Sequence, residues 1–352
     1  MEVNFQMRRT GYLGVALFLM ALALTAAPSF GQAKQPQLKT QPEYNAYRAI
    51  FDEKDPVKKA ELGEKFIADF KESEGVPNAF RMTIGAYSAA KNWAKVIATA
   101  NNAAAFPGAD NDLKAVAYGN AMVAAQNLND IANVINYGEK VLELQPGDLN
   151  AMITVSAVLP AKLPADAAGK NKALDRAQEL ASKGLAGVQG MEAKASAADK
   201  PQLEQIEGNL HGTLGLVAFN RPDYKKSIQE YEAAVQKAPK DEVAHYYLAL
   251  NFQTLASQAS NEYRAAVDAE NKLKAARADQ PTIDEAAAKS SGLAEDVKKY
   301  RDRAIDEFAI TVALGGQLAG QAKTTLTAMW TAKNDNTAGM EEFIAEKKKA
   351  LQ

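Results

Sequence analysis

The sequence has no cysteine among its 352 residues. Disulfides, thiolate metal sites, a cysteine nucleophile and a lipid-modified N-terminal cysteine are therefore excluded. Histidine and tryptophan are also scarce, with two residues of each, and aromatic residues make up only 7% of the chain. Hydrophobic residues nevertheless reach 47%, enough for a folded core. The stability of that core must come from packing alone.

An excess of one charge sign is missing as well. The chain has 41 basic and 43 acidic residues, which gives a formal net charge of -2. Nucleic-acid binders usually concentrate basic residues on one surface. The basic clusters at Lys58-Lys59 and at residues 347–349 stand among acidic residues, as is typical of a solvated helix face. We therefore expect no nucleic-acid partner.

The N-terminus has the pattern of an export signal. The basic pair Arg8-Arg9 precedes the uncharged, apolar stretch Gly11–Ala27, and small residues follow. This order of features predicts a secretory signal peptide over residues 1–31, with cleavage after Gly31.

Two alternatives to this prediction stay open. Cleavage could instead follow Ala33, or the apolar stretch could be kept as a membrane anchor, although it is at the short limit for a span. No later segment is apolar enough to cross a bilayer. We expect a mature protein that is exported to a periplasmic or extracellular space, with no stable membrane insertion after cleavage.

The rest of the chain predicts helices. Alternating β-branched runs are absent, and apolar residues recur at helical spacing almost throughout. Turn signals such as Pro107-Gly108, Pro146-Gly147 and Pro239-Lys240 separate the segments, which fall into pairs. Each pair is too small to bury its own apolar face, so neighbouring pairs must stack. The pattern predicts an all-α protein made of antiparallel helix pairs.

A repeat is visible within the C-terminal half. A shift of 34 residues aligns the segment that begins at His211 with the segment that begins at His245, and Leu214 then aligns with Leu248. Such a fixed period is the sequence signature of repeat architectures.

The residues of this repeat resemble the tetratricopeptide repeat (TPR) family. The match is best for His211–Pro239 and Tyr118–Pro146, where Leu214, Gly215 and Ala234 take the places of the family's packing residues. The resemblance implies a right-handed superhelical solenoid. It also implies a non-enzymatic protein that binds a protein or peptide partner on the concave face of the solenoid, with no cofactor.

Composition suggests how the mature chain is organised. We expect N-terminal helix pairs over residues 32–190, a polar linker over residues 191–201 and C-terminal helix pairs over residues 202–352. The last helix, Gly339–Leu351, has charges on one side as a terminal cap should.

The polar residues 256–297 interrupt the repeat. We predict an insertion of two long helices that project as a hairpin, and a mobile insertion is the alternative. Thr282 and Glu285 predict a capping box at the start of the second helix, and Ser290-Ser291-Gly292 predicts an interruption within it. Self-association through this hairpin is a further expectation.

Candidate catalytic groups are few. His211 and His245 hold equivalent repeat positions, so a two-histidine metal site with Glu207 is conceivable. We favour the alternative that both histidines are half-buried packing residues. The sequence also has no phosphate-binding glycine loop, nucleophile elbow or zinc-protease motif. We therefore predict no catalytic residue, no metal and no cofactor.

The resemblance also suggests where a partner would bind. In that family the first helix of each pair lines the concave face, which here gives the candidate partner-binding residues Asn209, Leu216, Phe219, Tyr246, Leu250 and Gln253. Alternatively, Leu216 and Leu250 pack against the next repeat.

We therefore predict an exported scaffold that binds a protein or peptide. By analogy with the family, cell-envelope assembly, secretion or pilus biogenesis are the processes it would serve. The alternative is a periplasmic binding protein for a small ligand or glycan held in the solenoid groove.

Overall fold

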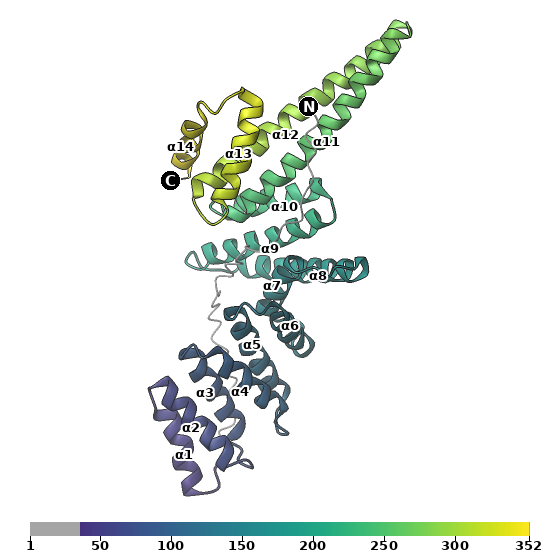
Figure 1. Ribbon diagram of the computed structural model, residues 1–352. Helices are drawn as coiled ribbons and strands as arrows, with labels where there is room; N and C mark the ends of the chain where they lie inside the picture. Colours follow the sequence, from purple (N-terminus) through teal and green to yellow (C-terminus); the bar gives the residue numbers. More distant parts are fainter. Residues whose placement is uncertain (1–35, 352) are drawn as a thin grey trace. The chain divides into compact units, whose positions relative to one another are not determined.

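A computed structural model describes residues 36–351, and all regular structure in this range is helical (Figure 1). The predicted all-α class is confirmed. The chain divides into two compact units, one that ends at Asp130 and one that begins at Ile131. The predicted signal peptide and both of its alternative cleavage positions lie outside the described residues.

The first unit contains five helices in its described part. They are α1 (Gln41–Asp52), α2 (Pro56–Asp69), α3 (Val76–Ala89), α4 (Trp93–Ala105) and α5 (Asn111–Asn127). Each helix packs against the next one along the chain, and α3 also contacts both α1 and α5. The odd-numbered helices of this unit are therefore neighbours.

The second unit has a similar arrangement, with helices that range from 10 to 35 residues. Its helices are α6 (Ile131–Leu144), α7 (Leu149–Val158), α8 (Ala167–Glu192), α9 (Lys200–Asn220), α10 (Tyr224–Lys237), α11 (Glu242–Ala275), α12 (Gln280–Leu314), α13 (Ala319–Asn334) and α14 (Met340–Ala350). A short 3₁₀ turn, Leu159–Ala161, follows α7. Successive helices pack on each other from α6 to α13, α9 also contacts α7 and α11, and α14 packs on α12.

The stretch expected to be a linker, residues 191–201, contains the end of α8 and the start of α9. These two helices pack against each other within the second unit. The division between the compact units falls earlier, after Asp130.

Aspartates begin many of the helices. A carboxylate just before the first turn accepts hydrogen bonds from backbone N–H groups that have no partner within the helix. Residues in this role are Asp55, Asp110, Asp148, Asp166, Asp223, Asp241 and Asp279. These caps fix where helices start in a chain whose alanine-rich sequence would otherwise allow the ends to shift.

An aromatic cluster lies at the centre of the second unit. Tyr231 on α10 is 1% exposed and stacks on Tyr247 of α11, with ring centroids 5.5 Å apart and planes 4° apart. Burial raises the pKa of Tyr231 well above its usual value. Gly215 on α9 leaves the space that the Tyr231 ring occupies.

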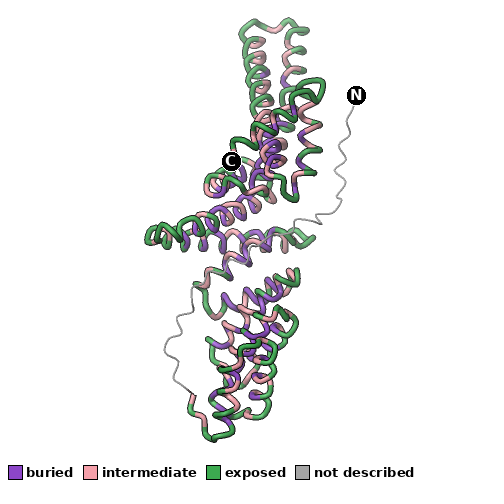
Figure 2. The backbone as a smooth tube through the Cα atoms, turned by 90° about the vertical axis from the view of Figure 1, so that its left-hand side faces the viewer, coloured by how far each residue is buried: buried purple, intermediate pink, exposed green. Residues whose placement is uncertain are grey.

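Helices α11 and α12, of 34 and 35 residues, lie side by side. Their ends near α10 and α13 are well buried, whereas their distal halves are mostly exposed (Figure 2). In the distal halves the buried positions are few and small, such as Ala266 and Ser290. The Ser290 hydroxyl donates a hydrogen bond of 2.7 Å to Glu270 and so joins the two helices there.

Two local predictions for α12 were wrong. The helix continues through residues 290–292, where an interruption was expected, because Ser290 bonds Glu270 and the Ala287 carbonyl without breaking the helix. The helix also begins earlier than the predicted capping box. Asp279 is its cap and accepts hydrogen bonds from the backbone N–H and the hydroxyl of Thr282.

We expect Gly215→Ala to destabilise the chain by about 1–3 kcal/mol, since the added methyl would lie 2.8 Å from the Tyr231 ring. Gly212→Ala is the matched control on the same helix. No atom lies within 4 Å of its added methyl group, so it should stabilise the chain by about 0.5–1 kcal/mol. Guanidinium unfolding followed by circular dichroism measures both. Equal effects for the two variants would contradict the close approach of α9 and α10.

Candidate functional site

The three predicted partner-binding residues on α9 are all partly exposed and differ in their contacts. The side-chain oxygen of Asn209 accepts a hydrogen bond from Gln205. Leu216 and Phe219 are partly buried and pack against the core of the second unit. The Phe219 ring lies 5.6 Å from the ring of Tyr247 on α11.

The three predicted residues on α11 also differ. Tyr246 is 6% exposed and lies in the core, with its ring 5.9 Å from that of Phe308. Leu250 packs against the same core, and Gln253 is partly exposed. Leu216 and Leu250 thus have core contacts of the kind that the packing alternative expects, and Tyr246 is the one buried residue of the six candidates.

The two histidines bind different glutamates. On α9, Nδ1 of His211 lies 2.8 Å from a carboxylate oxygen of Glu230 on α10. On α11, Nδ1 of His245 lies 2.7 Å from a carboxylate oxygen of Glu307 on α12, and its Nε2 lies 3.1 Å from the Pro239 carbonyl. In both cases a histidine of one helix is joined to a glutamate of the next helix.

The two pairs differ in the number of residues between the histidine and the glutamate. Glu230 follows its histidine by 19 residues and Glu307 by 62, a difference of 43. The aromatic residue after each glutamate is buried, as Tyr231 and Phe308 respectively. The same local arrangement therefore occurs twice, with 43 additional residues in the second case.

Glu207, considered as a third metal ligand, has other partners. One of its carboxylate oxygens accepts a hydrogen bond of 3.0 Å from Gln189, and the other lies 2.5 Å from the ammonium of Lys237. Among residues 36–351, no group of three or more histidine, aspartate or glutamate side chains is placed to hold a metal ion.

The surroundings of Glu207 shift its pKa. Burial acts to raise the pKa of Glu207, but the hydrogen bonds from Gln189 and Lys237 outweigh it, and the net pKa lies below the usual value of 4.5. A carboxyl group with a lowered pKa in the folded chain stabilises the fold above its unfolded pKa. That contribution is lost as the pH falls through the folded value.

We therefore expect Glu207→Gln to destabilise the chain at neutral pH, and the difference from the wild type to shrink as the pH falls below about 4.5. Thermal melting at a series of pH values measures this. Glu61→Gln, at an exposed position on α2, is the control and should follow the wild type at every pH. A Glu207→Gln deficit that does not change with pH would contradict the stabilising ion pair.

The two histidine pairs predict unequal losses on mutation. The side chains of His245 and Glu307 are 8% and 7% exposed, whereas those of His211 and Glu230 are 17% and 19% exposed. Removal of one partner of a buried hydrogen bond costs about 1–3 kcal/mol, and the cost is smaller where water can reach the group that is left. We expect Glu307→Ala to lower the free energy of unfolding more than Glu230→Ala, as measured in guanidinium. The reverse order would show that burial does not govern these pairs.

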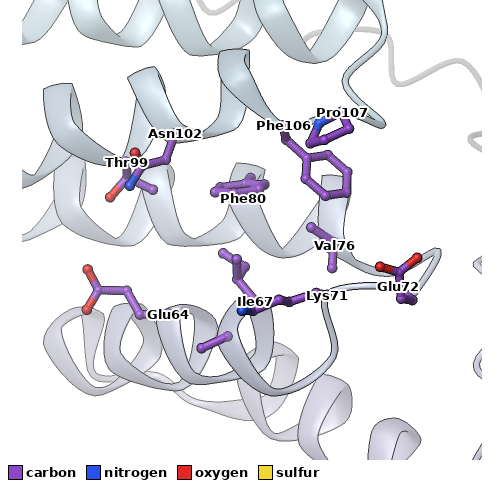
Figure 3. Close-up of a pocket in the computed structure, with 11 residues that line it drawn as sticks. Glu64, Ile67, Lys71, Glu72, Val76, Phe80, Thr99, Asn102, Phe106 and Pro107 are labelled. Atoms are coloured by element: carbon purple, nitrogen blue, oxygen red, sulfur yellow. The ribbon is translucent and has the colours of Figure 1, made fainter.

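A groove lies on the first unit between α2 and α4, and α3 forms its floor (Figure 3). Its volume is about 530 Å³. Phe80 and Val76 of α3 lie at the centre, and Ile67 of α2 lies on one wall. Phe106, whose ring is 5.8 Å from that of Phe80, closes one end together with Pro107.

Sequence reasoning missed this groove, because it looked to the first helix of each pair. The groove forms between two second helices, over the first helix between them. The available signal was the stripe Glu64, Ile67 and Ala68, which helical spacing places on one face of α2, with Lys71 in the turn that follows. Its mixture of charged and apolar residues is also found on solvated faces, so the stripe alone did not indicate a groove.

Comparisons with protein families and curated sequences found no match. None of the helices between residues 36 and 351 combines the length and the apolar character that a membrane span requires.

Proposed function

We propose that this chain is a non-enzymatic, exported scaffold of TPR type that holds a protein or peptide partner. The observation that carries the proposal is the recurrence of one packed unit: a histidine on one helix, a glutamate on the next, and a buried aromatic residue after the glutamate. Stacked units of this kind present an extended surface.

The contacts between helices support a solenoid within each unit. Helices pack on their sequence neighbours, and odd-numbered helices also contact one another, from α1 to α5 and from α7 to α11. In a stack of helix pairs, the first helices line one face and the second helices the other. By resemblance to the TPR family, we propose that these pairs form a right-handed superhelix.

The buried ionisable side chains favour a scaffold over an enzyme. His245 is bound at both ring nitrogens, by Glu307 and by the Pro239 carbonyl. The Glu207 carboxylate is bound by Gln189 and Lys237. Groups held in this way join helices to one another, whereas a catalytic group must reach a substrate.

The register of the two histidine pairs supports an insertion. The 34-residue repeat aligns Ala256 with Pro222. When Glu307 is aligned with Glu230, Tyr300 aligns with Asp223. The 43 additional residues are then 257–299, close to the predicted range 256–297. We propose that they form a projecting hairpin that offers a second surface for a partner or for self-association.

Deletion of residues 257–299 tests the insertion. At the junction, Leu255, Ala256 and Tyr300 are replaced by the turn sequence Arg221-Pro222-Asp223 of the preceding repeat. If the register is correct, the shortened chain keeps its helical content and a cooperative melt, because His245 still meets Glu307. A deletion two residues longer, 257–301, is the matched control and should melt at a lower temperature, since it leaves 17 residues instead of 19 between His245 and Glu307 and so rotates α12 relative to α11. Equal melting of both deletions would contradict the register.

Photo-crosslinking tests the scaffold itself. A photoreactive phenylalanine analogue is placed at Asn209, Gln253 or Tyr263 in the full chain, and at exposed Lys183 on α8 as the control. We expect irradiation of the producing cells to attach one other polypeptide at a candidate position, identified by mass spectrometry, and not at the control. Adducts with small molecules alone would favour the binding protein for a small ligand or glycan.

A further inference from the structure

We propose that the groove between α2 and α4 binds a short apolar segment of a partner protein that bears a carboxylate, and that Lys71 receives this carboxylate. The proposal rests on the proposed scaffold function and names one surface and the chemistry of what binds there.

The groove has the size and lining of a binding site. Its volume of about 530 Å³ lies within the range of roughly 300–1,000 Å³ that is usual for ligand pockets. Its floor and one end are apolar, with Phe80 and Phe106 as the largest groups. Ala68 keeps the α2 wall open because its side chain is small. An apolar side chain that entered would lose its contact with water against these rings, which is favourable.

The charges around the groove leave one cation available. At one end, Glu64 is neutralised by Lys95, with nitrogen and oxygen 3.1 Å apart. Lys71 has no ion pair or hydrogen bond within residues 36–351. Figure 3 shows its side chain running along the α2 wall beside Ile67, whereas the Glu72 carboxylate lies at the far end. A carboxylate is the natural complement of an unpaired ammonium at the edge of an apolar site.

Polar groups on the α4 wall favour a peptide. Figure 3 shows Thr99 and Asn102 on this wall. Thr99 is buried, whereas Asn102 is exposed and its side chain has no hydrogen-bond partner among the described residues. The amide of Asn102 can both donate and accept, which matches the C=O and N–H of a peptide backbone. A fatty acid has the apolar chain and the carboxylate but no such backbone.

Peptide selection tests the assignment while the partner is unidentified. A phage library of random dodecapeptides is panned on the full chain, and enriched peptides are synthesised with a fluorescent label. Their affinity is measured by fluorescence anisotropy. Their position is measured from the NMR signal of the Ile67 methyl group in the groove.

Two variants and two controls make the test specific. Ala68→Trp fills the groove, and Glu61→Trp places the same side chain at an exposed position of α2 outside it. Lys71→Gln, in the turn after α2, removes the unpaired charge, and Lys65→Gln on α2 removes a charge that is paired with Asp69. Circular dichroism confirms that each variant is folded.

The expected result is enrichment of peptides that combine apolar residues with an aspartate or glutamate. Ala68→Trp should weaken their binding by more than tenfold, and Lys71→Gln by about three- to tenfold, as for one charge-assisted hydrogen bond. The two controls should bind like the wild type. Replacing the acidic residue of the peptide by its amide should cost as much as Lys71→Gln and add little to it.

Other outcomes would overturn the proposal. Peptides that bind Ala68→Trp as well as the wild type would place the peptide site elsewhere and leave the scaffold function intact. If no peptide is enriched but sodium dodecanoate shifts the Ile67 methyl signal, the groove is a site for a small amphiphile. If neither probe shifts that signal, the groove is not a binding site, and photo-crosslinking decides the scaffold function separately.

Discussion

The structure depends on the burial of apolar helix faces against neighbouring helices. Each helix between residues 36 and 351 packs its apolar side against other helices, in most cases its neighbours in the sequence. The aromatic cluster of the second unit shows how tight this dependence is. Gly215 of α9 makes room for Tyr231 of α10, and Tyr231 stacks on Tyr247 of α11. Three successive helices therefore fix one another through one ring pair, and a single methyl group on α9 is enough to disturb it.

Polar contacts add specificity to this packing. His211 with Glu230 and His245 with Glu307 each join a helix to the following one, and the Glu207–Lys237 pair joins α9 to α10. Buried ionic groups are costly when they lack a partner, so these pairs favour one register of neighbouring helices over shifted ones. The aspartates that cap the N-termini of helices also favour one register, because each fixes the residue at which a helix starts. Packing thus holds the helices together, while the caps and ion pairs determine how far each is shifted along its neighbour.

Sequence reasoning predicted the helical class, because that class depends on local periodicity. It failed where tertiary contacts decide. Ser290-Ser291-Gly292 has poor helix propensity, yet α12 continues through it because packing against α11 and the bond to Glu270 outweigh that propensity. Tyr246 was assigned to an open face, but its neighbour Phe308 comes from a helix more than sixty residues away in the chain, which no local pattern reveals. The groove over α3 was missed for the same reason, since its walls come from two helices separated by a third.

The two histidine–glutamate pairs differ in the length of chain that each one closes. His245 and Glu307 are 62 residues apart, whereas His211 and Glu230 are 19 residues apart. The longer closure costs only about 1 kcal/mol more in chain entropy, because that cost grows with the logarithm of length. Contacts between the distal halves of α11 and α12, through small side chains such as Ala266 and Ser290, offset part of that cost. These distal halves contribute few buried residues, so their length can vary by whole helical turns while the buried ends of the two helices keep their packing.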